Sequence, residues 1–348
     1  MTQQIQNQTF VSMEPSLTRR VVTSTAFMIG AIVVVLIILF GLLSPNGVFL
    51  GSSNFQNLAL DSAQLILLSV GMTYLLGAAE LDLSIGANVI LSSVIAAKFM
   101  AALGGTPAEV LAGNYSNVGI AVGVGLVAAI ATGTLFGLVN ATLINYLKVN
   151  SFIVTLAMMS VGSGLAYIIT SGVNVTTLPP ELQGNFGSAE LFGVIPLPAI
   201  IAIGIGLIAW FVMAKLRFGI HTLGMGSSLG AAERAGVSVE KHRVKLFLVM
   251  GSIAGLVGFI DISRFLTTNI QGHQGDALAA IAAVVIGGTS LFGGRASIPG
   301  AMIAALIPAI LINGLVILGV GSFYQLVVTG IILLLAVGID QRRRPRAV

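Results

Sequence analysis

The chain lacks cysteine and carries very little charge. Its 348 residues include no cysteine, which excludes disulfides, thiolate metal sites and cysteine nucleophiles. Only 8% of the residues are charged, whereas a soluble domain carries about 25%. Hydrophobic residues make up 56% of the chain, which has a single Trp and 43 glycines. This composition indicates an integral membrane protein with closely packed helices, because small residues let helix backbones approach each other.

Two further absences narrow the functional class. The net charge of +4 comes from Lys and Arg at the ends of apolar runs, not from a basic face interleaved with aromatic residues. We therefore expect no nucleic-acid partner. The sequence has no GxxxxGK[ST] pattern, so it predicts no nucleotide site and no cofactor on this chain.

Apolar runs predict an all-α integral membrane fold with about ten transmembrane helices. Residues 1–20 form a polar N-terminal tail, residues 21–340 the membrane domain and residues 341–348 a basic C-terminal tail. The positive residues in both tails place both termini in the cytoplasm by the positive-inside rule. The expected apolar runs are residues 21–43, 57–79, 87–103, 118–139, 151–170, 197–214, 246–266, 277–286, 298–320 and 324–338.

Two apolar pieces are shorter than the roughly 20 residues that a bilayer crossing needs, namely residues 65–79 and 277–286. Each is followed by a polar or glycine-rich break, then by Ser-Ile at Ser84 or Ser297, and then by a new apolar helix. This shared plan predicts two short or broken helices, related as a parallel repeat, that meet near a transport pathway.

The first break contains two carboxylates, Glu80 and Asp82. A carboxylate at the centre of a lipid-facing helix costs about 2.5 to 3.5 kcal/mol, so lipid exposure is not expected. The break then lies at the cytoplasmic surface or in a water-lined gap. Asp82 or Ser84 also suits the N-cap of the next helix, a role that is compatible with substrate contact.

Residues 224–245 are a polar, basic interruption between two apolar runs. Residues 231–235 are good helix formers and Gly236 follows as a helix stop, so a short cytoplasmic helix is expected here. A second short element is expected at residues 239–243. An ordinary solvated loop is the alternative interpretation.

On the opposite side, residues 171–196 form a long polar loop, which is interpreted as a docking surface for another protein or as a mere connection. Asp261 and Arg264 have the i,i+3 spacing of a pair on one helix face. A contact of Arg264 with an outer partner is the alternative. The three histidines, His221, His242 and His273, lack metal-ligand spacing, which disfavours a metalloenzyme.

Three segments carry a resemblance to a known family. Residues 71–86 are similar to its Gly-Met-Thr … Gly-Gly-Ile-Asp-Leu-Ser-Val-Gly segment, residues 231–237 to its coupling helix, and residues 276–294 to its most distinctive stretch. The chain thus resembles, over nearly its whole length, the permease subunits of bacterial ribose/xylose-type ABC importers of monosaccharides. It departs from the pattern at Ala79-Glu80, which adds a carboxylate beside Asp82 and leaves the identity of the sugar open.

The resemblance implies a division of labour in the bacterial inner membrane. A second permease copy or a homologue would complete the sugar path, ABC ATPase subunits in the cytosol would drive it, and a periplasmic sugar-binding protein would deliver a ribose-like pentose, another sugar or a polyol. The ATPase-coupling residues would be Ala231, Ala232, Glu233, Arg234, Ala235, Gly236 and Val237. The pathway residues would be Asp82, Ser84, Asn88 and Asn140, and the contacts with the binding protein Glu181, Glu190 and Arg264. The alternative is an ion-coupled secondary transporter that uses Glu80, Asp82 and Asp261.

Overall fold

The computed structural model describes residues 25–321, 324–325, 327–328, 330–331 and 334. Both predicted tails and most of the predicted tenth span lie outside the described residues. Seven helices of the described part are long and apolar enough to cross a membrane. They are α3 (Ser52–Gly77), α4 (Ile85–Leu103), α6 (Val118–Leu147), α7 (Ser151–Thr170), α8 (Leu197–Lys215), α11 (Val239–Phe265) and the consecutive pair α13 (Ile298–Ala304) and α14 (Leu306–Ile317).

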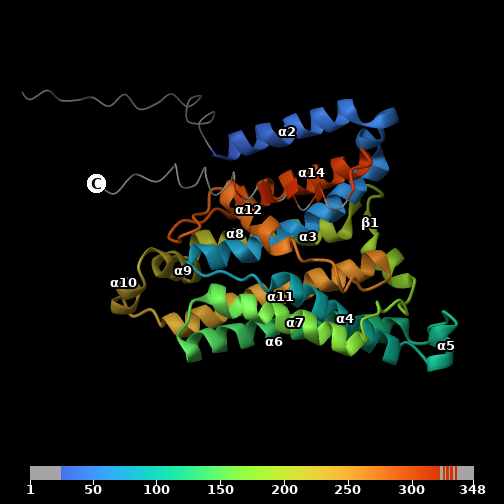
Figure 1. Cartoon of the computed structure of the whole chain (residues 1–348), viewed down its shortest axis with the longest axis horizontal. Helices are drawn as coiled ribbons and strands as arrows, with labels where there is room; N and C mark the ends of the chain where they lie inside the picture. Colours follow the sequence, from blue (N-terminus) through green and yellow to red (C-terminus); the bar gives the residue numbers. More distant parts are fainter. Residues whose placement is uncertain (1–24, 322–323, 326, 329, 332–333, 335–348) are drawn as a thin grey trace, which may run out of the picture.

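The remaining elements are α2 (Thr25–Leu43), at one edge of the bundle (Figure 1), and shorter elements. The shorter ones are η1 (Pro45–Leu50), α5 (Pro107–Leu111), η2 (Gln183–Gly187), a hairpin of β1 (Glu190–Leu191) and β2 (Ile195–Pro196), α9 (Arg217–Ser227), α10 (Leu229–Arg234) and α12 (Asp276–Ile286). The chain is therefore a multi-pass helical membrane protein, and the count of about ten crossings stays a prediction.

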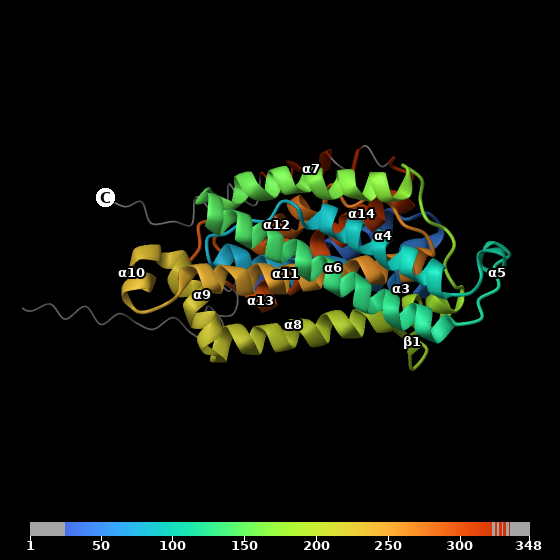
Figure 2. The same cartoon turned by 90° about the horizontal axis from the view of Figure 1, so that it is seen from below.

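The long helices lie side by side with their axes roughly parallel (Figure 1). Helix α2 lies at one edge of the bundle, next to α14. The view from below places α7 and α8 at opposite sides, with α6 and α11 between them (Figure 2). The short helices α9 and α10 lie at one end of the bundle and α5 and β1 at the other (Figure 1). These are called the α10 end and the α5 end below.

Helix α11 is at the centre of the bundle and packs against α6, α4 and α3. Its contact with α6 depends on glycine, because the two backbones nearly touch. A Cβ atom added at Gly137 would lie 2.1 Å from the carbonyl oxygen of Phe247, and one at Gly133 would lie 2.2 Å from that of Gly251. Larger side chains at these positions would force the two helices apart.

The prediction of a short helix at residues 65–79 is wrong. Helix α3 is one continuous helix of 26 residues, which begins before the apolar piece and includes Asp61 and Gln64. These polar side chains do not interrupt it, because Asp61 pairs with Arg264 and Gln64 donates to Asp261. The second expectation is confirmed, since α12 is an apolar helix of only 11 residues.

Two other boundaries differ from the expected ones. The short element predicted at residues 239–243 is the beginning of α11, where Val239 and His242 are buried in the bundle. The ninth apolar run is divided into α13 and α14 at Ala305. Pro308 explains the division, because it has no N–H to donate to the carbonyl of Ala304 four residues earlier.

Candidate functional site

Helix α10 is short and has a defined cap at each end. At its start, the Ser228 hydroxyl accepts a hydrogen bond of 3.3 Å from a backbone N–H of the first turn. At its end, the N–H groups of Gly236 and Val237 donate to the carbonyls of Glu233 and Ala232, at 2.9 and 3.0 Å. Gly236 has a φ of 83°, a left-handed conformation that glycine adopts without strain. The predicted helix stop at Gly236 is therefore confirmed.

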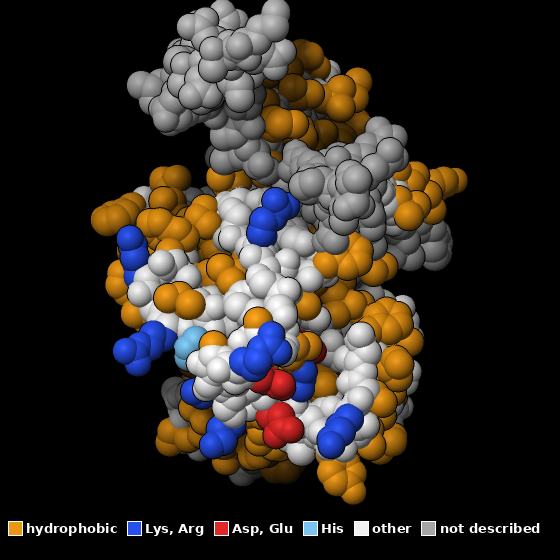
Figure 3. All heavy atoms as spheres, turned by 90° about the vertical axis from the view of Figure 1, so that its left-hand side faces the viewer, with side chains coloured by type: hydrophobic (Ala, Val, Ile, Leu, Met, Phe, Trp, Pro, Cys, Tyr) orange, Lys and Arg blue, Asp and Glu red, His pale blue; other side chains and the backbone are white. Residues whose placement is uncertain are grey.

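Most of the predicted coupling residues are exposed. In residues 231–237, Ala232 is buried, Val237 is half-buried and the other five are exposed. Lys and Arg side chains are scattered over this end of the molecule, around a surface of backbone and small polar side chains (Figure 3). The α10 end thus presents a short, capped, largely exposed helix on a face over which Lys and Arg side chains are scattered.

The break between α3 and α4 holds a compact polar cluster. One carboxylate oxygen of Asp82 accepts hydrogen bonds from the backbone N–H and the hydroxyl of Ser84. Asn140 on α6 donates its side-chain N–H to the Ser84 hydroxyl oxygen at 2.8 Å. Ser84 occupies the N-cap position of α4, but its side chain makes no capping hydrogen bond. The side chains of Asp82 and Ser84 therefore bind each other and Asn140 instead of capping the helix.

The four predicted pathway residues do not form one cluster. Asn88 lies one turn further along α4, where it donates to the carbonyl of Gly133 and accepts from Ser92, at 3.2 and 3.1 Å. All four residues are buried within the subunit. Leu83, in the same break, lines a cavity of about 350 Å3 between α4, α7 and the loop before α12. The break thus borders an open space, although the four polar side chains do not line that cavity.

Glu80 is engaged in an ion pair. Its carboxylate accepts a hydrogen bond of 2.6 Å from Nε of Arg243, near the start of α11. The same guanidinium donates to the side-chain oxygen of Asn145 on α6 at 2.6 Å. Both charged side chains are mostly buried, with exposed fractions of 7% for Glu80 and 14% for Arg243. The carboxylate that departs from the family pattern therefore joins the break to the helix that follows α10.

The breaks before α4 and α13 lie in contact at the α10 side of the bundle. The N–H of Gly294 donates to the carbonyl of Gly77, at the end of α3, at 3.0 Å. Gly226 of α9 lies against the same carbonyl, since a Cβ atom there would be 2.1 Å from it. Ser297 caps α13 by accepting a hydrogen bond from the N–H of Gly300 at 3.2 Å. The breaks before α4 and α13 and the end of α9 thus meet in one place.

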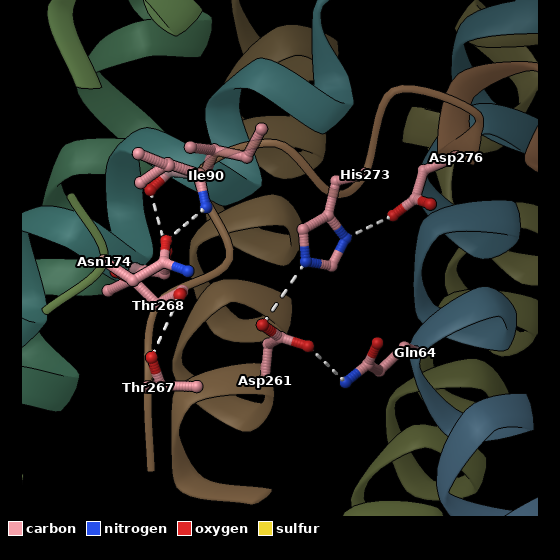
Figure 4. A network of polar contacts seen from close by, with 10 residues as sticks. Gln64, Ile90, Asn174, Asp261, Thr267, Thr268, His273 and Asp276 are labelled. Carbon is pink, nitrogen blue, oxygen red and sulfur yellow. Dashed lines mark hydrogen bonds and ion pairs between the residues drawn. The ribbon is translucent and has the colours of Figure 1, made fainter. Parts of the chain in front are cut away.

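The predicted pair of Asp261 and Arg264 does not form. Arg264 instead donates through Nη1 to Asp61 on α3 at 2.6 Å. Asp261 accepts from Gln64 at 3.4 Å and lies 3.3 Å from Nε2 of His273 (Figure 4). The prediction failed because α3 supplies a better placed partner for each side chain than the same helix does.

His273 lies in the loop before α12, between two carboxylates (Figure 4). Its Nδ1 is 2.8 Å from the carboxylate of Asp276, and its Nε2 faces Asp261. Burial lowers the pKa of His273, but the charges and hydrogen bonds of Asp276 and Asp261 outweigh this effect and raise its pKa well above the usual value. The His273 ring therefore links α11 to α12 through contacts of its two nitrogens with Asp261 and Asp276.

This polar network was missed in the sequence, although a signal was present. Asp61 and Gln64 interrupt an otherwise apolar run, and polar side chains inside a span usually have a partner or a function. The partners lie about 200 residues away in the chain, so spacing alone did not identify them.

The residues predicted to contact a binding protein differ in their exposure. Glu181 and Glu190 are exposed in the segment between α7 and α8. Arg264 has an exposed side-chain fraction of 12% and is engaged by Asp61. Its backbone carbonyl accepts a hydrogen bond of 2.6 Å from Gln183 of the same segment.

The histidines fall in two separate places. The rings of His221 and His242 lie 5.9 Å apart, and the Nε2 atom of His242 is 2.9 Å from the Thr222 hydroxyl. His273 lies in the network described above. Among the described residues, no group of three or more His, Asp or Glu side chains could hold a metal ion.

Residues 54–337 match the family described as "Branched-chain amino acid transport system / permease component". The chain belongs to this permease family. The permease is 34% identical over 315 residues to the ribose import permease protein of Escherichia coli, covering 89% of this chain and 92% of that protein. It is 31% identical over 310 residues to the D-allose transport system permease protein of Escherichia coli (89% and 90% covered) and 35% identical over 313 residues to the ribose import permease protein of Bacillus subtilis (89% and 90% covered). No solved structure matches it.

Proposed function

We propose that this permease is the membrane subunit of an ATP-driven importer that carries a monosaccharide across the bacterial inner membrane. One observation carries the proposal: about nine-tenths of the chain aligns with permeases named for ribose and allose. The substrate is then a ribose-like pentose, a related sugar or a polyol. Both termini and the α10 end face the cytoplasm in this arrangement, as the positive residues around α9 and α10 favour.

The energy for transport comes from ABC ATPase subunits that bind the α10 end. The support for this role is the geometry of α10, which is capped at both ends and largely exposed, on a face over which Lys and Arg side chains are scattered. The ion pair of Glu80 and Arg243 then passes a displacement of α11 to the break that contains Asp82. A rigid-body movement of this kind is a common way for a partner to open or close a pathway.

The remaining partners complete the pathway. A periplasmic sugar-binding protein docks on the α5 end, where Glu181 and Glu190 are exposed. A second copy of the permease or a homologue closes the path, which passes the break with Asp82, Ser84, Asn88 and Asn140. The cavity beside Leu83 supports this course.

The coupling role is tested by two variants of one residue on α10. Glu233→Pro removes a backbone N–H from this short helix, whereas Glu233→Ala keeps a good helix former at the same exposed position. We expect Glu233→Pro to reduce ATP-driven sugar uptake in proteoliposomes to the level without ATP, and Glu233→Ala to retain most uptake. Both complexes should remain assembled in detergent. Uptake by the proline variant equal to that of the wild type would show that α10 is not the coupling element.

A further inference from the structure

A cavity of about 960 Å3 opens between α3, η1, α12, α14 and the end of α11. Its volume falls in the range of small-molecule sites, about 300 to 1,000 Å3. Leu65 and Leu68 of α3 and Ile312 of α14 contribute to an apolar wall. Nine other lining residues are polar or aromatic and come from α3, α11, α12 and α14: Ser53, Asn54, Asn57, Asp61, Gln64, Arg264, Phe265, Asp276 and Asn313.

Several polar groups that line this cavity have hydrogen-bond donors or acceptors that no other described residue uses. Asp61 uses one carboxylate oxygen for Arg264, and Asp276 uses one for His273. Gln64 uses its side-chain N–H for Asp261, which leaves its carbonyl oxygen available. The side-chain amide of Asn57 has no partner within the described part of the chain. A ligand with several hydroxyl groups fits this set, because each hydroxyl both donates and accepts.

The charges of the lining favour a neutral ligand. Asp61 and Asp276 are acidic, and the one cation among the described lining residues, Arg264, is already paired with Asp61. A phosphorylated sugar or the carboxylate of an amino acid would meet these carboxylates without an unpaired cation to balance it. A free sugar brings no charge, so it avoids this cost.

Phe265 supplies a flat apolar surface beside the polar groups. Its side chain is 52% exposed, and the Arg264 guanidinium lies 4.8 Å from the ring centroid, which holds the two side chains together. A sugar ring has hydroxyl edges and a C–H face, and the cavity offers both kinds of contact. Polar groups on membrane-spanning helices are costly in lipid and mark substrate paths when they border an aqueous space.

We propose that this cavity is a binding site for a neutral monosaccharide in its free form, a proposal that rests on the function proposed above. Asp61, Gln64 and Asn57 hold the hydroxyl groups, and Phe265 packs against the ring. The site lies toward the α5 end, so it receives the sugar before the break with Asp82 does. The ion pair between Asp61 and Arg264 holds the Asp61 side chain in place.

The absence of cysteine in the chain permits a direct test by thiol labelling. Asn57→Cys places a thiol in the cavity lining, and Gln56→Cys places one on the preceding residue of α3, which does not line the cavity. Each variant, assembled with its ATPase, is labelled with a membrane-impermeant maleimide with and without D-ribose or D-allose. We expect sugar at about twice its Kd to slow labelling at residue 57 about threefold and to leave residue 56 unchanged, because protection follows the occupied fraction.

A second measurement does not depend on cysteine chemistry. Gln64→Leu removes one hydrogen-bonding group from the cavity and should lower sugar uptake about fivefold, the effect of one net hydrogen bond. Gln56→Leu is the control and should retain uptake. If the wild type takes up sugar with ATP, but sugar does not protect residue 57 and Gln64→Leu keeps full uptake, the proposed binding site is wrong and the proposed function stands. A residue 57 thiol that never reacts also overturns the binding site, because the cavity is then filled by lipid or another chain. Failure of the wild type to take up any sugar overturns the proposed function instead.

Discussion

At the scale of single residues, Glu80 and Arg243 illustrate how a charge is kept inside a membrane bundle. The two side chains form an ion pair of 2.6 Å, and Asn145 accepts a further hydrogen bond from the guanidinium. Both lie on the α10 side, between the break and the start of α11. Removing one partner of such a buried pair leaves the other charge without compensation, whereas removing both avoids that cost.

The ion pair therefore predicts a specific pattern of unfolding free energies. Glu80→Gln alone should destabilise the permease by about 3 to 5 kcal/mol, and the double variant Glu80→Gln/Arg243→Gln should recover part of this loss. Unfolding in detergent with a denaturant series measures the effect. Lys241→Gln, at an exposed position on the same helix, should change stability by no more than about 0.5 kcal/mol. If the two single effects simply add in the double variant, the pair has no energetic coupling.

At the scale of elements, the α6 and α11 backbones approach each other along a row of glycines. Gly133 and Gly137 on α6 face Gly251 and Phe247 on α11, with no space for a Cβ atom. Two other glycines of α6, Gly119 and Gly123, have open surroundings. A Cβ atom at Gly123 would meet nothing within 4 Å. The helix therefore contains glycines that the packing requires and glycines that it does not.

This difference predicts opposite outcomes for one substitution at two positions of α6. Gly137→Val should destabilise the protein by about 1 to 3 kcal/mol, because it separates α6 from α11. Gly123→Val should be nearly neutral, since it adds a side chain to open space. Thermal unfolding in detergent, followed by loss of monodisperse protein, compares the two. Equal midpoints for the two variants would contradict the close backbone contact.

At the scale of the whole molecule, the sequence has no GxxxxGK[ST] motif, and the residues that the structure describes form no group that could hold a metal ion. Of the carboxylates that an ion-coupled transporter would use, Glu80 is paired with Arg243 and Asp261 faces His273. Asp82 is bound by Ser84. This arrangement favours a subunit that is moved by a partner over one that is driven by protons or sodium.

The whole-molecule prediction concerns the source of energy. The permease reconstituted alone, with a proton or sodium gradient, should not accumulate D-ribose or D-allose. Addition of the ATPase, the loaded binding protein and ATP should start accumulation. Radiolabelled uptake into proteoliposomes measures both conditions. Accumulation by the isolated subunit would establish the ion-coupled alternative.

The sequence by itself determined the class of protein, because composition and long apolar runs depend only on local chemistry. It also determined the helix stop at Gly236 and the short helix α12, since each is set by a few adjacent residues. The resemblance in residues 71–86, 231–237 and 276–294 identified the importer family before any geometry was known.

Only the tertiary structure decided how the polar side chains are paired. Asp61 and Gln64 find Arg264 and Asp261 about 200 residues away, which keeps α3 continuous and replaces the pair expected within α11. Glu80 likewise finds Arg243 on a distant helix. Burial favours a partner for each polar group in the bundle, but which partner it meets depends on how the helices pack. That packing is a property of the whole chain and cannot be read from the spacing of neighbouring residues.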